Sequence, residues 1–253
     1  MTNQYVVSAE NVGKSFSGVS VLNDITVQVK KGESVAIIGP SGSGKSTLLR
    51  CMTFLETMDF GSLSYGELCP VTESANKKSN YASKELVNQA KSRFGLVFQN
   101  FNLFPHYSVL KNIMDAPICV QKRNADEVHT EALALLEKMG LSGKEDSVPC
   151  ELSGGQCQRV AIARALACKP EVIFFDEPTS ALDPELTQEV LKVIRDLASE
   201  HMTMVIVTHE MAFAREVANR VIFMEGGYIV EEGSARDVLD NPQHHRTRAF
   251  IGA

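Results

Sequence analysis

Short apolar runs recur along this chain and predict strands that are buried on both faces of a sheet. Three of them cover residues 34–38, 172–175 and 204–207, and a fourth covers residues 94–98. Runs of this length that are rich in Val, Ile and Phe are typical of parallel strands in an open α/β sheet. Ligands bind at the carboxyl ends of such strands, so the polar residues that follow each run are candidate site residues.

The first third of the chain has the alternating pattern of a different kind of strand. Apolar and polar residues alternate at 5–12 and 25–29, and a turn is expected between them at 14–18. A short strand is expected at 62–68. It is followed by a polar surface stretch of little regularity that extends to Gln89.

Helices are indicated where apolar residues repeat at helical spacing. Residues 127–139 carry one apolar face and end at Gly140, and a second helix is expected at 157–166. The segment after Pro184 repeats apolar residues in the same way. A terminal hairpin is expected at 221–233.

Composition and charge restrict the classes of function. The chain has 253 residues, of which 44% are hydrophobic and 22% charged, which is ordinary for a globular protein. A formal net charge of -6 argues against a basic face, so no nucleic-acid partner is expected. No apolar run approaches the ~18 residues that span a bilayer, and the start of the chain lacks the pattern of a signal peptide.

Six cysteines are present, and no two of them form a C-x-x-C pair. Most have apolar neighbours, so we expect reduced packing residues in a cytosolic protein and no metal site formed by cysteine. The six residues are Cys51, Cys69, Cys119, Cys150, Cys157 and Cys168.

A glycine-rich segment lies between the expected strand at 34–38 and a helix expected from Leu48 onward. Its spacing matches the phosphate-binding loop, in which glycines let backbone N–H groups point at phosphate oxygens and the helix adds partial positive charge. Lys45 would bind the β- and γ-phosphates, and the Ser46 hydroxyl would bind Mg²⁺. The segment consists of Gly39, Pro40, Ser41, Gly42, Ser43, Gly44, Lys45, Ser46 and Thr47.

Polar side chains follow three of the other expected strands. Gln99 ends the first, Asp176 and Glu177 end the second, and His209 lies just beyond the third. Because side chains alternate along a strand, the two adjacent carboxylates point in different directions and are suited to different roles. Histidine is usually a packing or surface residue, but at this place it is a candidate donor to an anion.

A serine and two glycines begin a long expected helix in the middle of the chain. Ser153, Gly154, Gly155 and Gln156 follow Leu152 directly. Backbone N–H groups at such a helix start form an anion site. Taken alone, this pattern is weak evidence for a functional site. Its position in the chain after the glycine-rich loop makes it informative.

Together these motifs resemble the nucleotide-binding subunits of the ATP-binding cassette (ABC) family, over essentially the whole chain. The resemblance implies an α/β fold with a P-loop NTPase core, an N-terminal antiparallel β subdomain and an inserted α-helical signature subdomain. It implies one nucleotide-binding domain at 1–253, with a helical lobe at about 100–168. The implied cofactors are ATP and Mg²⁺.

The resemblance also implies roles for the motif residues of one subunit. Phe16 would stack on adenine, although the family more often has tyrosine there and a core position for Phe16 is the alternative. Gln99 and Asp176, with Ser46, would bind or orient Mg²⁺. The catalytic residues would be Glu177 as the base, His209 as a donor to the γ-phosphate, and Gln99 near the attacking water.

A homodimer with two shared ATP sites is implied as well. In the family, the segment 153–156 contacts the γ-phosphate bound by the other subunit, and the loop that contains Asp183 runs along the dimer seam. This chain has Cys157 where the family usually has glutamine. The substitution falls on the helix beyond the loop, so we expect it to alter packing and to leave function intact.

A narrower resemblance points to the polar amino-acid uptake branch of the family. It implies a bacterial importer ATPase at the cytoplasmic face of the membrane. Its partners would be separate integral-membrane permease subunits and, indirectly, an extracytoplasmic amino-acid-binding protein. The segments that carry this resemblance are 101–106, 207–211, 213–217 and 241–250.

Two other classes of protein share the glycine-rich loop. A soluble ABC ATPase of DNA repair, chromosome structure or translation would show a long coiled coil, a basic face or two cassettes, and the sequence shows none of these. A small-molecule P-loop kinase would leave residues 152–156 and His209 unexplained. For the apolar loop at 101–104, packing under the helical lobe and contact with a partner both remain open.

Overall fold

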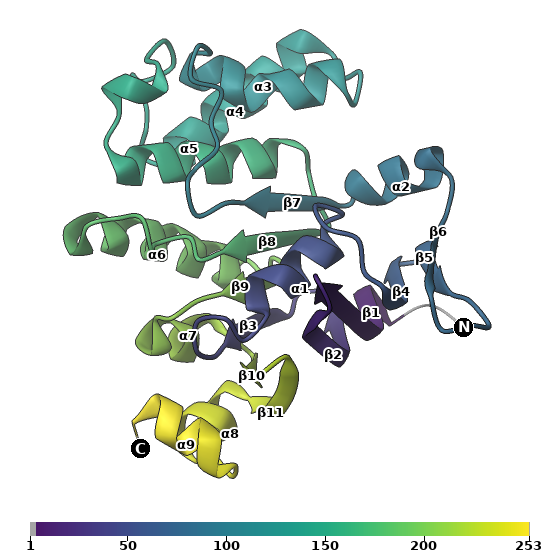
Figure 1. The fold of residues 1–253 in the computed structure, drawn as a ribbon. Coiled ribbons are helices and arrows are strands. Elements are labelled where there is room, and N and C mark those ends of the chain that lie inside the picture. Colours follow the sequence, from purple (N-terminus) through teal and green to yellow (C-terminus); the bar gives the residue numbers. More distant parts are fainter. Residues whose placement is uncertain (1–3, 253) are drawn as a thin grey trace.

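The computed structural model describes residues 4–252, which form two sheets and a layer of helices (Figure 1). The strands are β1 (Tyr5–Phe16), β2 (Val19–Lys30), β3 (Ser34–Ile38), β4 (Phe60–Tyr65), β5 (Leu68–Glu73), β6 (Ser79–Tyr81), β7 (Phe94–Val97), β8 (Val172–Asp176), β9 (Met204–Val207), β10 (Arg220–Glu225) and β11 (Tyr228–Ser234).

The helices connect these strands and also form the end of the described chain. They are α1 (Lys45–Met52), α2 (Lys84–Lys91), α3 (Val109–Cys119), α4 (Ala125–Lys138), the short 3₁₀ turn η1 (Pro149–Glu151), α5 (Gly154–Ala167), α6 (Pro184–Ser199), α7 (Met211–Val217), α8 (Ala235–Asp240) and α9 (His245–Ile251).

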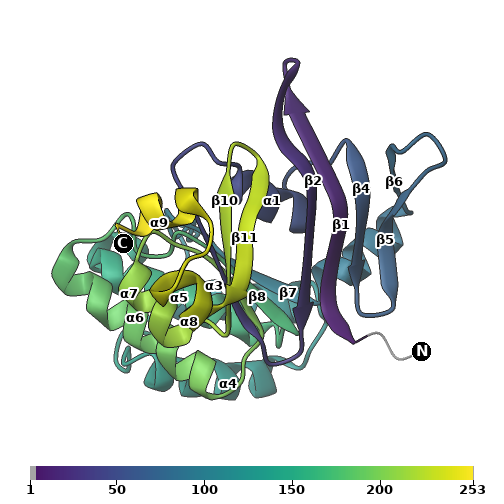
Figure 2. The same cartoon turned by 90° about the horizontal axis from the view of Figure 1, so that it is seen from below.

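The five-stranded sheet has the order β2-β1-β4-β5-β6, and all its neighbours pair antiparallel. Its long first hairpin, β1 and β2, extends beyond the rest of the sheet in Figure 2. The alternation in the sequence accounts for the pairing, because alternate residues such as Val27 and Val29 of β2 are buried while Gln28 between them is not.

The six-stranded sheet has the order β11-β10-β3-β9-β8-β7. Strands β10, β3, β9, β8 and β7 pair in parallel, and β11 returns antiparallel as the expected terminal hairpin. Every residue of β3, β8 and β9 is buried. The uninterrupted apolar runs in the sequence therefore correspond to strands covered on both faces.

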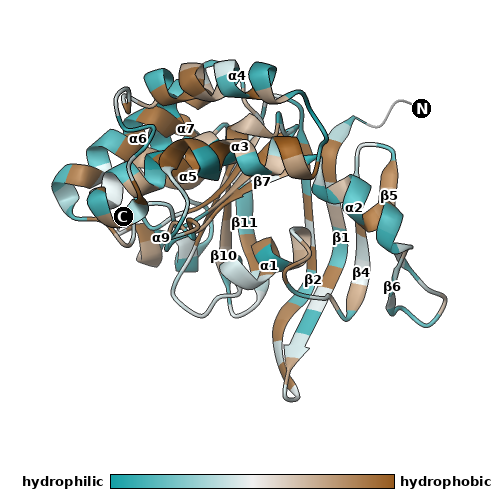
Figure 3. Ribbon diagram, turned by 90° about the horizontal axis from the view of Figure 1, so that it is seen from above, coloured by the Kyte–Doolittle hydropathy of each residue, from teal (hydrophilic) through white to brown (hydrophobic). Residues whose placement is uncertain are grey.

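Three hydrophobic clusters cover the two faces of this parallel sheet, and the smallest packs β3 and β10 against α7 and α8. Helix α1 packs between the two sheets, where Leu48, Leu49 and Met52 join a core with residues of both. On the other face, helices α3 to α7 contribute to a second core with β8 and β9. Figure 3 shows the central strands mostly in brown beneath these helices, whereas α2 is largely hydrophilic.

The first turn lies later in the chain than expected. Strand β1 continues through Lys14 to Phe16, so the turn contains only Ser17 and Gly18, and the prediction of a turn at 14–18 is wrong in its extent. The reason is that Lys14 is buried and its ammonium group pairs with Glu56 at 2.9 Å. A charged residue in the strand interrupts the alternation without ending the strand.

The polar stretch before β7 is more regular than expected. The strand expected at 62–68 is β4, which ends at Tyr65, and the supposedly irregular stretch contains β5, β6 and α2. These elements bury few side chains: Ala90 is the buried residue of α2, and β6 has none. With most of their surface exposed they carry little periodic apolar signal, so the sequence pattern did not predict them.

The cysteines range from buried to exposed, and Cys168 is half-buried. Cys51 and Cys157 are buried, as expected for packing residues, but Cys69, Cys119 and Cys150 are exposed. The prediction of packing roles is therefore wrong for those three, because apolar neighbours in sequence do not fix which side of an element faces the core. All six are free thiols.

The apolar loop after β7 combines both of the open alternatives. Leu103 packs against the core beneath the helical layer, whereas the Phe104 side chain is 50% exposed. Packing explains the first residue, and the exposed ring of the second remains available for a partner.

Candidate functional site

The loop between β3 and α1 has a backbone path that glycine permits. Gly39 has φ 145° and Gly44 has φ 98°, both in the region that favours glycine. A Cβ on Gly39 would lie 2.0 Å from the Met224 carbonyl oxygen, and one on Gly44 would lie 2.8 Å from that of Val21. No side chain caps α1 at Gly44, so its first turn offers backbone N–H donors to an anion.

Lys45 is buried at the start of α1, and its ammonium group bonds to the loop itself. The Nζ atom donates to the carbonyl oxygens of Gly39 at 2.9 Å and Pro40 at 3.0 Å. Burial lowers the pKa of Lys45, and the carboxylates of Glu177 and Asp176 act in the opposite direction. A partly desolvated ammonium beside a glycine-rich loop is suited to bind phosphate oxygens.

Ser46 and Asp176 form the contact between α1 and β8. The Ser46 hydroxyl donates to the Asp176 carboxylate at 2.7 Å. Asp176 is 7% exposed, and burial raises its pKa, although the bond from Ser46 lowers it. These hard oxygen donors and the buried carboxylate fit a Mg²⁺ ion that would share its coordination with phosphate oxygens.

Glu177 and His209 lie side by side at the carboxyl ends of β8 and β9. The His209 Nε2 atom is 2.8 Å from the Glu177 Oε1 atom. Glu177 has φ 48°, and the bond from its N–H to the Val207 carbonyl at 3.0 Å fixes this unusual conformation. Asp176 and Glu177 thus have different partners, as expected. Strand alternation is not the cause, because β8 ends at Asp176 and Glu177 lies beyond it with a left-handed backbone.

Two other predicted residues of one subunit lie on exposed parts of the chain. Gln99 is exposed on the loop that follows β7. Phe16 is 42% exposed at the end of β1, with the Lys14 ammonium 4.9 Å from its ring centre. The exposure of Phe16 excludes the core position that the sequence left open.

The signature segment, residues 153–156, belongs to the helical layer and is separate from the glycine-rich loop. Ser153 caps α5: its hydroxyl accepts from the Gln156 N–H at 3.2 Å, and its own N–H donates to the Gln156 side chain at 2.9 Å. Asp183 occupies the N-cap position of α6 without a capping bond from its side chain, and it is exposed. Helix α5 packs on α3, α4, α6 and β7, whereas α1 packs on β2, β8 and β9, so the predicted residues form two groups.

Two residues that contact the loop around Gln99 (residues 98–102, the Gln99 loop) were not identified from the sequence motifs. Gln158 is fully buried in α5, and Arg164 lies about one and two-thirds turns further along the same helix. Both side chains donate to backbone carbonyls of the loop. The available signal was a set of polar residues in a helix whose other positions are apolar or glycine, among them Gln158 and Arg164.

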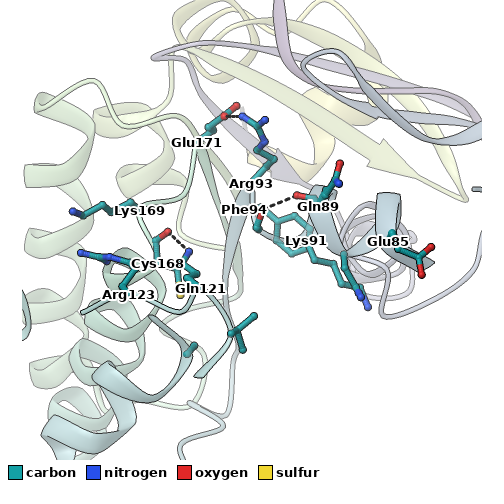
Figure 4. A pocket seen from close by; sticks show the side chains of 14 residues that line it. Glu85, Gln89, Lys91, Arg93, Phe94, Gln121, Arg123, Cys168, Lys169 and Glu171 are labelled. Atoms are coloured by element: carbon teal, nitrogen blue, oxygen red, sulfur yellow. Dashed lines mark hydrogen bonds and ion pairs between the residues drawn. The ribbon is translucent and has the colours of Figure 1, made fainter. Parts of the chain in front are cut away.

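A large groove lies away from these motifs, at the amino ends of β7 and β8 (Figure 4). It has a volume of about 1040 Å³ between α2 on one side and the ends of α3 and α5 on the other. Its apolar residues include Phe94, Ala116 and Val120, and its charged side chains include Arg93, Arg123 and Lys169. Across residues 4–252, no three or more His, Cys, Asp and Glu side chains gather as a metal cluster.

Comparison with known proteins identifies the class of protein that this fold and site define. The family model described as ABC transporter matches residues 22–180. The chain belongs to this family, and it is an ATP-binding ATPase subunit. The predicted family and fold class are confirmed.

Individual relatives cover nearly the whole chain. The L-cystine transport system ATP-binding protein TcyN of Escherichia coli (strain K12) is 54% identical over 97% of this chain and 96% of its own length. The arginine transport ATP-binding protein ArgV of Corynebacterium glutamicum is 49% identical over 99% of both chains. These names agree with the narrower resemblance to amino-acid uptake proteins.

A solved structure shares the fold at lower identity. It is a dimeric post-hydrolysis state of the ATP-binding cassette MJ0796 bound to ADP and Pi, with a TM-score of 0.75 and 33% sequence identity. The match covers 91% of this chain and 99% of that one. In the part of this chain that the structure describes, no helix has the length and apolar character needed to cross a membrane.

Replacing Asp176 by Asn should stabilise the nucleotide-free protein, because an ionised carboxylate is buried there at a cost. The pKa of Asp176 is raised, so the folded state favours its protonated form. The stabilising difference should therefore be largest at neutral pH and should vanish as the pH falls below the ordinary Asp value. We expect a Tm about 2 °C higher at pH 7, measured by thermal unfolding.

Asp196→Asn is the matched control, because Asp196 is exposed on α6. Its Tm should equal that of the unchanged protein at every pH. A lower Tm for Asp176→Asn at pH 7 would show that its contacts with Ser46 and Lys45 outweigh the cost of burial.

Proposed function

We propose that this chain is the ATP-hydrolysing subunit of an importer for a polar amino acid, working at the cytoplasmic face of the membrane. The transport names of the cystine and arginine relatives support the substrate class. The observation that carries the catalytic part is the convergence of Ser46 with Asp176 and of Glu177 with His209 at one sheet edge. Separate permease subunits and an extracytoplasmic binding protein would handle the amino acid.

Each side chain at the sheet edge has a proposed task. Lys45 binds the β- and γ-phosphates of ATP, while Ser46, Asp176 and Gln99 hold Mg²⁺, which neutralises phosphate charge when bound. Glu177 accepts a proton from the attacking water. His209 donates to the γ-phosphate, and its contact with Glu177 holds both side chains in place. Phe16 supplies an exposed ring for adenine.

Glu177→Gln tests this assignment. An amide accepts no proton, so hydrolysis should fall by at least ~100-fold while ATP affinity is retained. The variant should also accumulate an ATP-bound dimer, visible as a change in size on gel filtration. Near-normal turnover in the variant would rule out Glu177 as the base.

The described chain is proposed to act as one nucleotide-binding domain, with a helical lobe at about 100–168, in a homodimer. The separation of the signature segment from the glycine-rich loop supports this proposal, because a partner subunit would supply the missing half of each site. Ser153, Gly154, Gly155 and Gln156 would contact the γ-phosphate bound by the partner, with Asp183 at the seam between subunits. The solved cassette MJ0796 is dimeric with ADP and Pi bound.

Complementation between two inactive variants tests the shared sites. Lys45→Ala should lose nucleotide affinity through loss of a charge-assisted contact, and Ser153→Arg should place a bulky cation against the backbone donors of the signature. A mixture should regain part of the ATPase activity, because one composite site of the heterodimer then combines two intact halves. No recovery despite demonstrated subunit exchange would contradict the shared-site proposal.

The large groove is proposed to receive the permease. It separates α2 and the start of β7 from the ends of α3 and α5, so a partner there contacts both the sheet and the helical layer. Val120 stands 75% exposed in this groove, and Phe94 and Ala116 line the same groove, so a partner seated there would cover apolar surface. The other end of β7 leads into the Gln99 loop, so a partner in the groove lies one strand away from the nucleotide site.

Val120→Asp should weaken binding to the permease and leave ATP hydrolysis by the isolated subunit unchanged. The measurement is the fraction of the subunit that co-purifies with membranes containing the co-expressed permease. Leu133→Asp is the matched control, since Leu133 is also exposed, at 38%, but lies on α4 outside the groove. Equal recovery of both variants with the membranes would contradict the proposed docking site.

A further inference from the structure

Two side chains of α5 hold the backbone on both sides of Gln99. The Gln158 Nε2 atom donates to the Phe98 carbonyl oxygen at 3.2 Å, directly before Gln99. The guanidinium of Arg164 donates to the carbonyl oxygens of Phe101 at 3.2 Å and Asn102 at 2.7 Å, two and three residues after it. The loop is therefore fixed at both ends by one helix.

The backbone of this loop needs such support. Phe101 has φ 60° and Asn102 has φ 48°, so two consecutive residues other than glycine adopt the left-handed conformation. This conformation is unfavourable, above all for phenylalanine, and persists where surrounding contacts enforce it. The two donors of Arg164 reach the carbonyls of these same two residues.

Burial sets both side chains apart from ordinary surface residues. Burial lowers the pKa of Arg164, whose guanidinium also lies 6.0 Å from the Phe104 ring centre. Gln158 is fully buried, and its Oε1 atom has no hydrogen-bond partner. A methionine would fill the same space without a buried polar atom, so packing alone does not account for glutamine here.

The helix that carries these donors also begins with the signature. Ser153 caps α5, and a Cβ on Gly154 would lie 3.6 Å from the Phe101 ring. Because a helix moves as a rigid element, a shift of the signature segment displaces Gln158 and Arg164 with it. The carbonyls that they bind must follow, or the hydrogen bonds must break.

We propose that Gln158 and Arg164 are positioning residues that couple the signature segment to Gln99. They place the Gln99 side chain for catalysis when a partner's nucleotide engages Ser153. This inference rests on the proposed roles of Gln99 and the signature. Neither residue belongs to the proposed nucleotide contacts, and the side chains of both donate to the loop, so both act through it.

The test compares steady-state ATP hydrolysis by the full-length protein and its variants. Arg164→Ala should lower kcat about tenfold and leave KM for ATP within about twofold, because the nucleotide contacts remain. Arg164→Lys should recover part of the loss, since an ammonium reaches one of the two carbonyls. Gln158→Met, which keeps the volume, should lower kcat in the same direction by a smaller factor.

A double-mutant cycle with Gln99→Ala separates positioning from general stability. When Gln99 is already absent, Arg164→Ala should change kcat by less than about twofold. Arg195→Ala is the control, because Arg195 bonds to Glu216 on α7 and touches no residue of the loop. If Arg164→Ala does not fold, the same cycle is measured with Gln158→Met, alone and combined with Gln99→Ala, and kcat is compared in the same way.

Two outcomes would overturn the inference. The first is that Arg164→Ala, or Gln158→Met, lowers kcat by the same factor in the Gln99→Ala variant as in the unchanged protein. The other is a rise in KM with kcat unchanged. A Gln99→Ala variant with normal kcat would instead contradict the proposed role of Gln99 itself, so the two failures are distinguishable.

Discussion

Parallel pairing of β9 with both β3 and β8 is the constraint on which the site depends. Val207 is opposite Ile37 on one side and Asp176 on the other. This register brings the start of the glycine-rich loop, the two carboxylates and His209 to the same edge of the sheet. A slip of one residue would turn Asp176 to the opposite face and separate it from Ser46. The buried apolar runs therefore fix the register, and the register fixes the chemistry.

Burial at this edge works against both of the charges that the site requires. It lowers the pKa of Lys45 and raises the pKa of Asp176, so the folded protein disfavours each charged form. The two groups offset each other only in part, because burial has the largest effect on both pKa values. The nearby Glu177 carboxylate favours the charged form of Lys45 and disfavours that of Asp176. Phosphate oxygens and a divalent cation would supply the missing charges. Burying the charges of Lys45 and Asp176 costs free energy in the protein without nucleotide. Part of this cost would be relieved when a nucleotide and its metal ion bind, so the site should favour the two together.

How much the sequence predicted depended on how deeply each element is buried. The strands of the parallel sheet and the apolar face of α4 have clear hydrophobic patterns in the sequence. Nearly every polar substitution at these positions would place a polar group in the core. Elements β5, β6 and α2 bury few side chains, and their polar sequences were indistinguishable from a loop. The motif residues were recognised because phosphate binding demands particular residue types. Gln158 and Arg164 were not recognised, because they bind backbone carbonyls. Every residue type has a backbone carbonyl, so the loop sequence does not show that these contacts exist.

Helix α5 connects three features that would otherwise seem independent. Its first turn carries the signature, its middle holds the Gln99 loop, and the chain just beyond its end lines the large groove through Cys168 and Lys169. With 14 residues it is about 21 Å long, which is short enough to move as one rigid element. On the proposed roles, a partner that presses on the groove would act on the same helix that would meet the nucleotide of the other subunit. Communication between the two surfaces needs no long chain of side chains, because the backbone hydrogen bonds of a single helix already connect them.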